Sequence, residues 1–423
     1  MAITLELLLN GTVSPTGRYV GWSPAPAQLR VLNADGAVDP IHVRLASPPG
    51  RGGRVVFAPR RDAEAGDEIE LDLATDGTPT DFWVLGRFQT PSRNDRDARI
   101  AVFRPGRVTP LVSFWLMVRV RKDAQTLTYY EKRRLLSALA RVDDAAVGLY
   151  QSYRDAHTAD TSDEAHDLDA FLPWHRAYLL DLERELQAVD PSVTIPYWRF
   201  DQPAPQLFAE SFLGRSEPTG VVRFSASNPL QLFSSDGQIG ITRLPRFDVA
   251  TQMAGNVNGP VIEEAVVINA AIPYARLRPP VESNPHGQAH VSFSGYISRI
   301  PTAVRDPLFF FLHANVDRLW AKWQWINHRF DVTRQDSYFF RTPANSPGAT
   351  RIGHNAPDTM WPWNNIRGGL RPSTASRTPF PASPVVAAPG GSPTVGAMVD
   401  YQGVIDQENR LGFDYDDVPF ELD

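Results

Sequence analysis

The sequence predicts a multidomain protein in which an all-β, sandwich-like domain is followed by a mainly α-helical domain. Residues 1–106 contain short extended runs separated by Gly, Pro and Asp turns, a spacing that is typical of a β-sandwich. In residues 107–345 apolar side chains recur at helical intervals. A run rich in Pro, Ser and Ala lies at 371–393. We therefore predict that residues 346–423 form an extended connector and a closing segment packed on the helical domain.

Length and composition exclude several classes of protein. The chain has 423 residues, of which 42% are hydrophobic, enough for two or three domains with their own cores. It contains no cysteine, which excludes disulfides, Cys-ligated zinc and iron–sulfur clusters. A net charge of -6 without a basic block argues against nucleic acid or an anionic membrane as a partner. No apolar run approaches the roughly 20 residues that span a bilayer.

The predicted strands of the first domain begin at the N-terminus. Met1–Asn10 lacks the basic start of a signal peptide and carries Glu6 within its apolar part, so we predict a strand there and a cytoplasmic protein. Further extended runs lie at 28–32, 42–45, 54–57, 68–73, 81–85 and 100–103. The sequence does not decide the role of this domain: it could support the packing of the second domain, bind a partner, or partly cover the active site.

Three histidines fall within nineteen residues of the helical domain. Apolar residues follow His175 at offsets 3, 4, 7, 11 and 14, so His175 lies near the start of a helix that faces inward. His166 precedes it by nine residues, and Pro173 argues against one continuous helix, so a turn can bring the two rings together. His157 ends the helical run 129–156 and can converge from a second helix. Three imidazoles from separate segments suit a three-coordinate metal site with an open position.

A second histidine cluster downstream strengthens the metal interpretation, because a lone histidine beside an apolar face is more often a core residue. His286 and His290 are four residues apart, so on a helix both rings point the same way and can chelate one ion. The zinc-protease signature needs Glu after the first His, and Gly287 stands there instead. An Asp-Pro pair at 306–307 predicts the start of another helix, and His313 lies beside its apolar stripe.

Two polar residues of that last helix attract attention. Asn315 is the one polar interruption of the apolar stripe. Asp317 lies one turn after His313, where its carboxylate can hold the His313 ring in place.

Two groups of three histidines, the second built from His-x-x-x-His and a later histidine, resemble the type-3 dicopper proteins: tyrosinases, catechol oxidases and other polyphenol oxidases. The phrases that carry the resemblance are Phe-Leu-Pro-Trp-His-Arg-Ala-Tyr-Leu at 171–179, Ile-Pro-Tyr-Trp at 195–198 and Asp-Pro-Leu-Phe to His-Ala-Asn-Val-Asp-Arg-Leu-Trp at 306–320. The resemblance covers about residues 108–345 and, more faintly, 411–419. Without cysteine, the chain lacks the Cys-His thioether of plant and fungal members and looks more like the bacterial branch.

The resemblance implies a four-helix-bundle core with long loops, two copper ions and dioxygen as co-substrate. The implied ligands of copper A are His157, His166 and His175, and those of copper B are His286, His290 and His313. Neutral imidazoles suit copper in either oxidation state. The implied reaction is oxidation of o-diphenols to o-quinones, with monophenols and o-aminophenols as further substrates. The expected partner is a small phenol, and neither nucleic acid nor membrane.

Departures from the family pattern bear on monophenol hydroxylation, which needs the incoming phenol to be deprotonated. The family is thought to use a water held by a Glu near copper B and an Asn next to the first copper B histidine. Glu282 lies four residues before His286 and fits the Glu position, whereas Gly287 takes the Asn position. We therefore expect diphenol oxidation to dominate, with Asn284 or the long loop that follows Trp198 as other candidates for the deprotonation.

Other departures concern the pocket and the C-terminus. Leu312 stands where many relatives have histidine, and with Val291 it makes the copper B side more apolar, which favours bulky hydrophobic phenols or o-aminophenols. Phe309 is expected to stack on a ligand ring or on the substrate.

In the closing segment Phe413 replaces the first Tyr of the family's Tyr-x-Tyr motif. The ten residues after Phe413 leave no lid domain, so we expect activity without proteolytic cleavage.

The residues alone leave three classes of function open. A phenol or catechol oxidase is favoured. A dioxygen carrier or catalytically silent dicopper protein would bind oxygen reversibly without turning over catechol. A mononuclear metal hydrolase would hold one ion.

Overall fold

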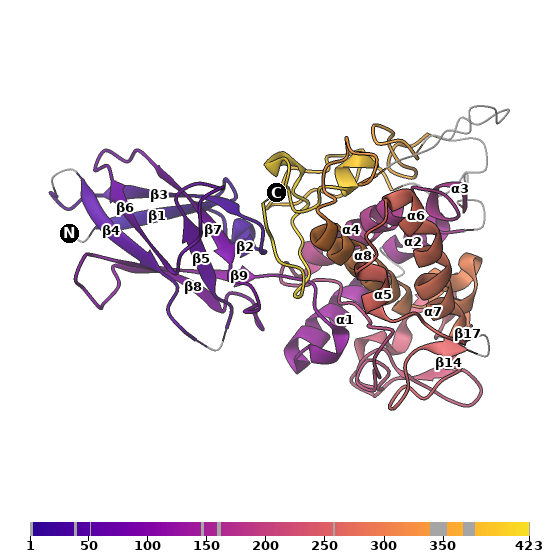
Figure 1. Ribbon diagram of the computed structural model, residues 1–423. Helices are drawn as coiled ribbons and strands as arrows, with labels where there is room; N and C mark the ends of the chain where they lie inside the picture. The colour runs from indigo at the N-terminus through magenta and orange to yellow at the C-terminus, as the bar shows by residue number, and fades with distance from the viewer. Residues whose placement is uncertain are drawn as a thin grey trace. The chain divides into compact units, whose positions relative to one another are not determined.

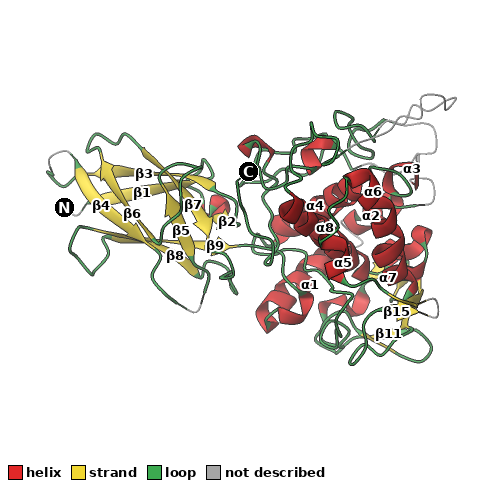
Figure 2. Cartoon of the chain, in the orientation of Figure 1, coloured by secondary structure: helices red, strands yellow, loops and turns green. Residues whose placement is uncertain are grey.

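The structure is a computed structural model that describes residues 3–37, 40–50, 52–144, 148–158, 162–256, 259–338, 353–366 and 377–422. The chain divides into two compact units. The first contains residues 1–120, 383–387 and 410–422, and the second contains 121–382 and 388–409. Figure 2 shows strands in the first unit and mostly helices in the second, which confirms the predicted succession of a β-rich and a helical part.

The first unit consists of two sheets that share one apolar core (Figure 1). One sheet has the order β1 (Thr4–Leu9), β3 (Ala25–Asn33), β7 (Thr80–Gly86), β5 (Val55–Ala58). The other has the order β2 (Tyr19–Val20), β9 (Val112–Val118), β8 (Ala98–Phe103), β4 (Ile41–Ala46), β6 (Glu68–Leu73). All pairs are antiparallel except β2 with β9. Alternate residues of β3 are buried, as a strand with one face on a core requires.

Strand β9 corrects the sequence interpretation, which began the helical domain at residue 107. Val112–Val118 reads Val-Ser-Phe-Trp-Leu-Met-Val and pairs with β8 over its first five residues. Such a short apolar run does not distinguish a strand from a buried helix by periodicity. Pairing with β8 decides in favour of the strand, and the first unit extends to Val120.

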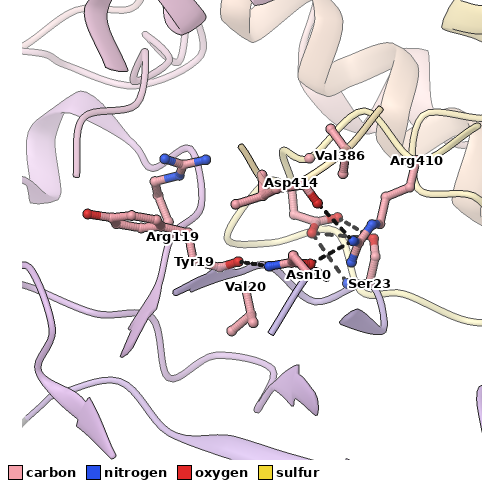
Figure 3. Close-up of a pocket in the computed structure, with 11 residues that line it drawn as sticks. Asn10, Tyr19, Val20, Ser23, Arg119, Val386, Arg410 and Asp414 are labelled. Carbon is pink, nitrogen blue, oxygen red and sulfur yellow. Dashed lines mark hydrogen bonds between the residues drawn. The ribbon is translucent and has the colours of Figure 1, made fainter. Parts of the chain in front are cut away.

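The expected closing segment is shared between the units. Residues 410–422 belong to the first unit, not the helical one, and Figure 3 shows how they attach. Asp414 accepts a hydrogen bond from the Trp22 amide at 2.8 Å, and Arg410 donates to the Pro24 carbonyl at 2.7 Å and to Asn10 Oδ1 at 2.9 Å. The hollow between these groups measures only about 10 Å³.

The second unit is mainly helical. Its longer helices are α1 (Tyr129–Asp143), α2 (Leu149–Ala156), α4 (Phe171–Val189), α6 (Tyr274–Val281) and α8 (Leu308–Asn327), and its shorter ones α3 (Ser162–Ala165), α5 (Glu264–Ile268) and α7 (Gln288–Val291), with a π-turn, η5 (Glu282–Gly287), before α7. Small two-stranded antiparallel sheets pair β10 (Arg215–Ser216) with β11 (Val222–Arg223), β12 (Ser234–Ser235) with β13 (Gln238–Ile239), β14 (Arg243–Pro245) with β17 (Phe293–Gly295), and β15 (Gly255–Asn256) with β16 (Gly259–Pro260). Among the described helices, none combines the length and apolar character of a bilayer span.

Local sequence signals explain where these helices begin. Thr128 and Glu131 form a reciprocal capping box at the start of α1. Pro173 lies in the first turn of α4, where the amide that proline lacks would have no helical partner. The Asp-Pro pair marks the start of α8 one residue later than predicted, because Pro307 is the N-cap and Asp306, just before it, accepts a hydrogen bond from the Leu308 amide at 3.0 Å.

Candidate dinuclear metal centre

Six histidines converge inside the second unit from five places in the chain. His157 is the residue after α2, His166 follows α3, and His175 lies in α4. His286 and His290 lie in η5 and α7, and His313 lies in the second turn of α8. The chain turns between His166 and α4 at Asp167, whose φ is 65°. This break lets His166 and His175 face the same point, as the sequence predicts.

The six rings form two groups of three. His157, His166 and His175 can offer ligand atoms that lie within 4.8 Å of one another, and so can His286, His290 and His313. Ring centroids are 4.9 Å apart for His157 and His166 and 4.7 Å apart for His286 and His290.

The two groups face each other. His175 of the first group stacks on His313 of the second, with a centroid distance of 4.1 Å and an interplanar angle of 9°. His166 and His286 lie 6.2 Å apart across the same gap. The arrangement is therefore that of two adjacent metal sites rather than two separate ones.

Backbone carbonyl groups orient three of the rings. The Nδ1 atoms of His175, His286 and His290 lie 2.8, 2.9 and 2.7 Å from the carbonyl oxygens of Phe171, Glu282 and Ile297, respectively. A carbonyl oxygen only accepts, so each Nδ1 carries the proton and each Nε2 presents a lone pair. Such contacts set the tautomer of a metal-binding histidine.

The nitrogens that point into the centre satisfy a test for metal ligands. Within the described residues no hydrogen-bond partner reaches His175 Nε2, His286 Nε2 or either ring nitrogen of His157. The Nε2 atoms of His290 and His313 face each other at 3.2 Å. Buried nitrogens without partners are costly in a protein interior, and metal ions would satisfy them. The donor set of neutral imidazoles fits copper.

Burial keeps these imidazoles neutral. Desolvation, reinforced by neighbouring histidines, lowers the pKa of His157 to about 3, and desolvation alone lowers that of His290 to about 4. The pKa values of His166, His175, His286 and His313 are also well below the usual value, with desolvation as the largest cause. A neutral ring keeps the lone pair that a metal ion needs.

Apolar side chains enclose the rings. Phe309 is fully buried and lies 4.2 Å from His313 and 4.7 Å from His157 between ring centroids, so it packs on ligand rings as predicted. Leu312 is also fully buried. Val291, next to His290, is half-buried. Phe309 therefore packs on ligand rings of both triads, whereas Leu312 and Val291 are known only as the chain neighbours of His313 and His290.

Asp317 and Asn315 lie elsewhere than the sequence suggests. No described residue hydrogen-bonds to His313 Nδ1, so Asp317 does not hold that ring. Its carboxylate instead accepts hydrogen bonds from Arg176 at 2.6 Å and Arg121 at 3.1 Å. Asn315 Oδ1 accepts from Arg318 at 3.0 Å. Asp317 therefore joins α8 to other elements through Arg176 and Arg121, and Asn315 bonds to an arginine of α8 itself.

The two residues expected to act on a phenol are close to the second triad. Glu282 accepts hydrogen bonds from the Asp167 amide at 2.5 Å and from Arg278 at 2.5 Å, one on each carboxylate oxygen. Burial raises the pKa of Glu282. A Cβ added at Gly287 would lie 3.2 Å from the Glu282 carbonyl oxygen, the acceptor that orients His286. Asn284 is engaged away from the centre, since it accepts from the Ile262 amide at 2.8 Å.

Sequence reasoning missed the polar contacts that position the helices. Arg243 and Asp306 form a fully buried ion pair at 3.0 Å, which ties β14 to the start of α8. The carbonyl oxygens that orient the histidines were also missed. The sequence could have indicated a buried ion pair for Arg243, since a charged residue among apolar neighbours needs a partner. It could not indicate the carbonyl oxygens, because every residue has a backbone carbonyl group.

Comparisons with known proteins agree with this geometry. A family model described as the common central domain of tyrosinase matches residues 144–326. The tyrosinase of Streptomyces lincolnensis is 32% identical over 270 residues, which cover 58% of this chain and 93% of the relative. The tyrosinase of Streptomyces glaucescens is 32% identical over 275 residues, with the same coverage. Among solved structures, a functional unit of Octopus hemocyanin matches with a TM-score of 0.43 and 21% identity over 72% of this chain and 69% of that chain.

Proposed function

Because the chain belongs to the tyrosinase family of type-3 copper proteins, we propose that it oxidises o-diphenols to o-quinones with dioxygen. It is a copper-dependent oxidoreductase whose two copper ions are held by the two histidine triads. The observation that carries the proposal is the pair of facing triads, joined by the stacked rings of His175 and His313. Bound copper supplies the redox chemistry, in which four electrons and four protons from two diphenols reduce one dioxygen to two waters.

The protein's own contribution is to prepare the ligands and to control access. Carbonyl oxygens of Phe171, Glu282 and Ile297 keep Nδ1 of three ligand rings protonated, so each Nε2 is ready to bind metal without reorganisation. Phe309 packs on the rings of His157 and His313 and excludes water from them. Five of the six ligands are buried, and only His290 is partly exposed, so a phenol reaches the centre on the side of His290.

The surroundings of Gly287 support a preference for diphenols over monophenols. Glycine offers no side-chain amide to orient a water beside Glu282, and the Glu282 carboxylate already accepts two hydrogen bonds. A general base of this kind is worth on the order of 100-fold or more. Its weakness should slow monophenol hydroxylation more than oxidation of a diphenol, which loses its proton more easily.

The apolar side chains around the second triad bear on the range of substrates. Leu312 and Val291 offer no charge near the ring of a bound phenol, which supports hydrophobic o-diphenols and o-aminophenols as substrates. The helices α2, α4, α7 and α8, which end at or carry the ligands, are our candidates for the four-helix core of the family.

The test combines metal analysis with oxygen uptake. The purified chain loaded with copper should hold two copper ions and consume oxygen when catechol is added, whereas the same chain loaded with zinc should not. A single metal ion per chain would point to a mononuclear hydrolase. Reversible oxygen binding without catechol turnover would point to a carrier. Either result would overturn the proposal.

A further inference from the structure

A hollow of about 520 Å³ lies in the second unit where the two-stranded sheet β14–β17 meets the 3₁₀ turns η6 (Tyr296–Ser298) and η7 (Ile300–Arg305). Its lining includes two arginines, Arg246 and Arg299, and five side chains that carry a hydroxyl group. No aspartate or glutamate is among the residues that line it. The hollow is therefore a local cationic site in a chain whose net charge is -6.

The charges of the two arginines are not neutralised within the described residues. Arg246 and Arg299 are exposed and form no ion pair there. Two neighbouring arginines behave differently, since Arg243 pairs with Asp306 and Arg305 with Asp236. A guanidinium group matches a carboxylate in charge and in the geometry of its donors. The hollow thus suits an anionic group with two oxygen atoms.

The hollow lies close to His290. Val291 lines it, and its Cα is about 3.8 Å from that of His290 by covalent geometry. The Ile297 carbonyl, which lies 2.7 Å from His290 Nδ1, stands in the chain between Tyr296 and Ser298 of the lining. His290 is also the one ligand of the two triads that is partly exposed, so the hollow lies beside the ligand that solvent reaches.

Backbone contacts join the two chain segments that carry Arg246 and Arg299. The Arg246 amide donates to the Ser292 carbonyl at 2.8 Å, and the Tyr296 amide donates to the Thr242 carbonyl at 2.9 Å. Gly295 has a φ of +104°, and a Cβ there would lie 2.2 Å from the Thr242 oxygen. The two chain segments therefore approach as closely as glycine permits, and the hollow is formed before a ligand binds.

We propose that this hollow binds the carboxylate of a phenolic acid, a catechol whose ring substituent ends in an acidic group, while the ring reaches the copper centre beside His290. The inference rests on the proposed oxidation of o-diphenols and specifies the class of diphenol. Arg246 and Arg299 determine the specificity by pairing with the carboxylate. An amine in the same place would face two positive charges without an acid to balance them.

Binding of a substrate analogue that cannot be oxidised tests the inference directly. Calorimetric titration of the copper-loaded chain with 3-phenylpropionate and with its amide should show three- to tenfold tighter binding of the acid, the range expected for partly exposed charge pairs. Arg246→Gln with Arg299→Gln should remove the difference. Arg246→Lys with Arg299→Lys should restore part of it. Added salt should weaken binding of the acid but not of the amide.

Arg276→Gln is the matched control, because Arg276 is an exposed arginine of the same unit that does not line the hollow. It should leave the ratio of acid to amide binding unchanged. Equal binding of acid and amide by the unaltered chain, or an equal effect of Arg276→Gln, would overturn the inference. Inorganic phosphate that binds as tightly as 3-phenylpropionate and competes with it would also overturn it, since the hollow would then hold a free anion.

Turnover separates this inference from the proposed function. With 3-(3,4-dihydroxyphenyl)propionate and its amide as substrates, the acid should have the lower KM, and the double Gln variant should raise that KM. Acid-selective binding without any oxidation of either compound would contradict the proposed function while leaving the carboxylate site in place. Oxidation of both compounds with equal KM would contradict the inference alone.

Discussion

At the scale of single residues, His157 has the least support from its surroundings. It is the C-cap of α2, and both of its ring nitrogens are buried without a hydrogen-bond partner among the described residues. Its ring nevertheless lies 4.9 Å from that of His166 and 5.8 Å from that of His175. Leaving a buried nitrogen unsatisfied costs about 1–3 kcal/mol, so we expect its role as a ligand to explain its position.

His157→Ala should leave one copper ion per chain instead of two and abolish oxygen uptake with catechol, because the first site keeps only two imidazoles. Elemental analysis and an oxygen electrode measure these outcomes. His328→Asn is the control, since His328 lies outside both triads and asparagine tolerates its φ of 50°. Full copper content and activity in His157→Ala would show that the ligand assignment is wrong.

Gly287 is a second residue whose effect can be isolated. Its φ of -57° and ψ of -39° are ordinary helical values, so the backbone does not require glycine. Gly287→Asn should raise the ratio of monophenol hydroxylation to catechol oxidation by up to about 100-fold, because its amide can orient a water beside Glu282. Initial rates with tyramine and dopamine provide the ratio.

Gly287→Ala separates this effect from crowding. An added Cβ meets the Glu282 carbonyl oxygen at 3.2 Å in both variants, but alanine brings no amide. An equal rise of the ratio in Gly287→Ala would therefore contradict the argument. So would an unaltered chain that hydroxylates monophenols without lag at its catechol rate.

At the scale of elements, the contact between α4 and α8 sets the distance between the two triads. Arg176 of α4 and Arg121 pair with Asp317 of α8 at 2.6 and 3.1 Å, and both guanidinium groups are fully buried. His175 is the neighbour of Arg176 in α4, and His313 lies one turn before Asp317 in α8. The same helices that form this buried ion pair therefore carry the stacked rings.

Asp317→Asn should destabilise the second unit by about 3 kcal/mol, because removing one partner leaves a buried charge uncompensated. Urea denaturation measures the loss. Asp144→Asn removes an exposed partner of Arg141 instead and should cost less than about 1 kcal/mol. Equal costs for the two variants would contradict the importance given to the buried pair.

The end of α1 introduces a dependence of stability on pH. Asp143 accepts a hydrogen bond from the Ser234 amide at 2.8 Å, and burial raises its pKa to about 7. The unfolded value is about 3.9, so between pH 4 and 7 the folded state binds more protons than the unfolded one. The contribution of Asp143 to stability therefore falls as pH rises through this window.

Asp143→Asn removes this titration while keeping an acceptor for Ser234. The melting temperature of the variant should decrease less, or increase more, between pH 4 and pH 7 than that of the unaltered chain. Scanning calorimetry at several pH values tests this. Identical pH profiles for the two proteins would mean that the pKa of Asp143 is not raised in the folded state.

At the scale of the whole molecule, the C-terminal residues 410–422 belong to the β-rich unit that the N-terminal residues begin, and side-chain hydrogen bonds attach them to it. Asp414 accepts hydrogen bonds from the amides of Trp22 at 2.8 Å and Ser23 at 3.3 Å. Asp414→Ala should lower the stability of the first unit by about 1–3 kcal/mol, the cost of two buried amides without acceptors. In the same variant, hydrogen exchange of the Trp22 amide should be faster than in the unaltered chain. Asp72→Ala, at an exposed pair with His42, is the control and should change neither quantity.

The outline of the fold and the metal ligands follow from local signals. His286 and His290 are four residues apart, and His175 begins an apolar stripe of helical period. Both patterns depend only on residues within a few turns of one another, which is the range over which helix geometry is set. The succession of a β-rich part and a helical part could be predicted for the same reason.

The sequence by itself predicted the six histidines of the two triads, His286 and His290 from their helical spacing and the full ligand set from the resemblance to the family. The structure confirms that they gather in two groups of three, and their binding of copper stays a prediction. Only the tertiary structure decided that Val112–Val118 is a strand, since pairing with β8 had to choose between two conformations of an apolar run. It also decided that Asp317 pairs with Arg121, which is 196 residues away, rather than holding His313. Such contacts depend on which distant segments meet, and buried charges take whichever opposite charge packing brings within reach.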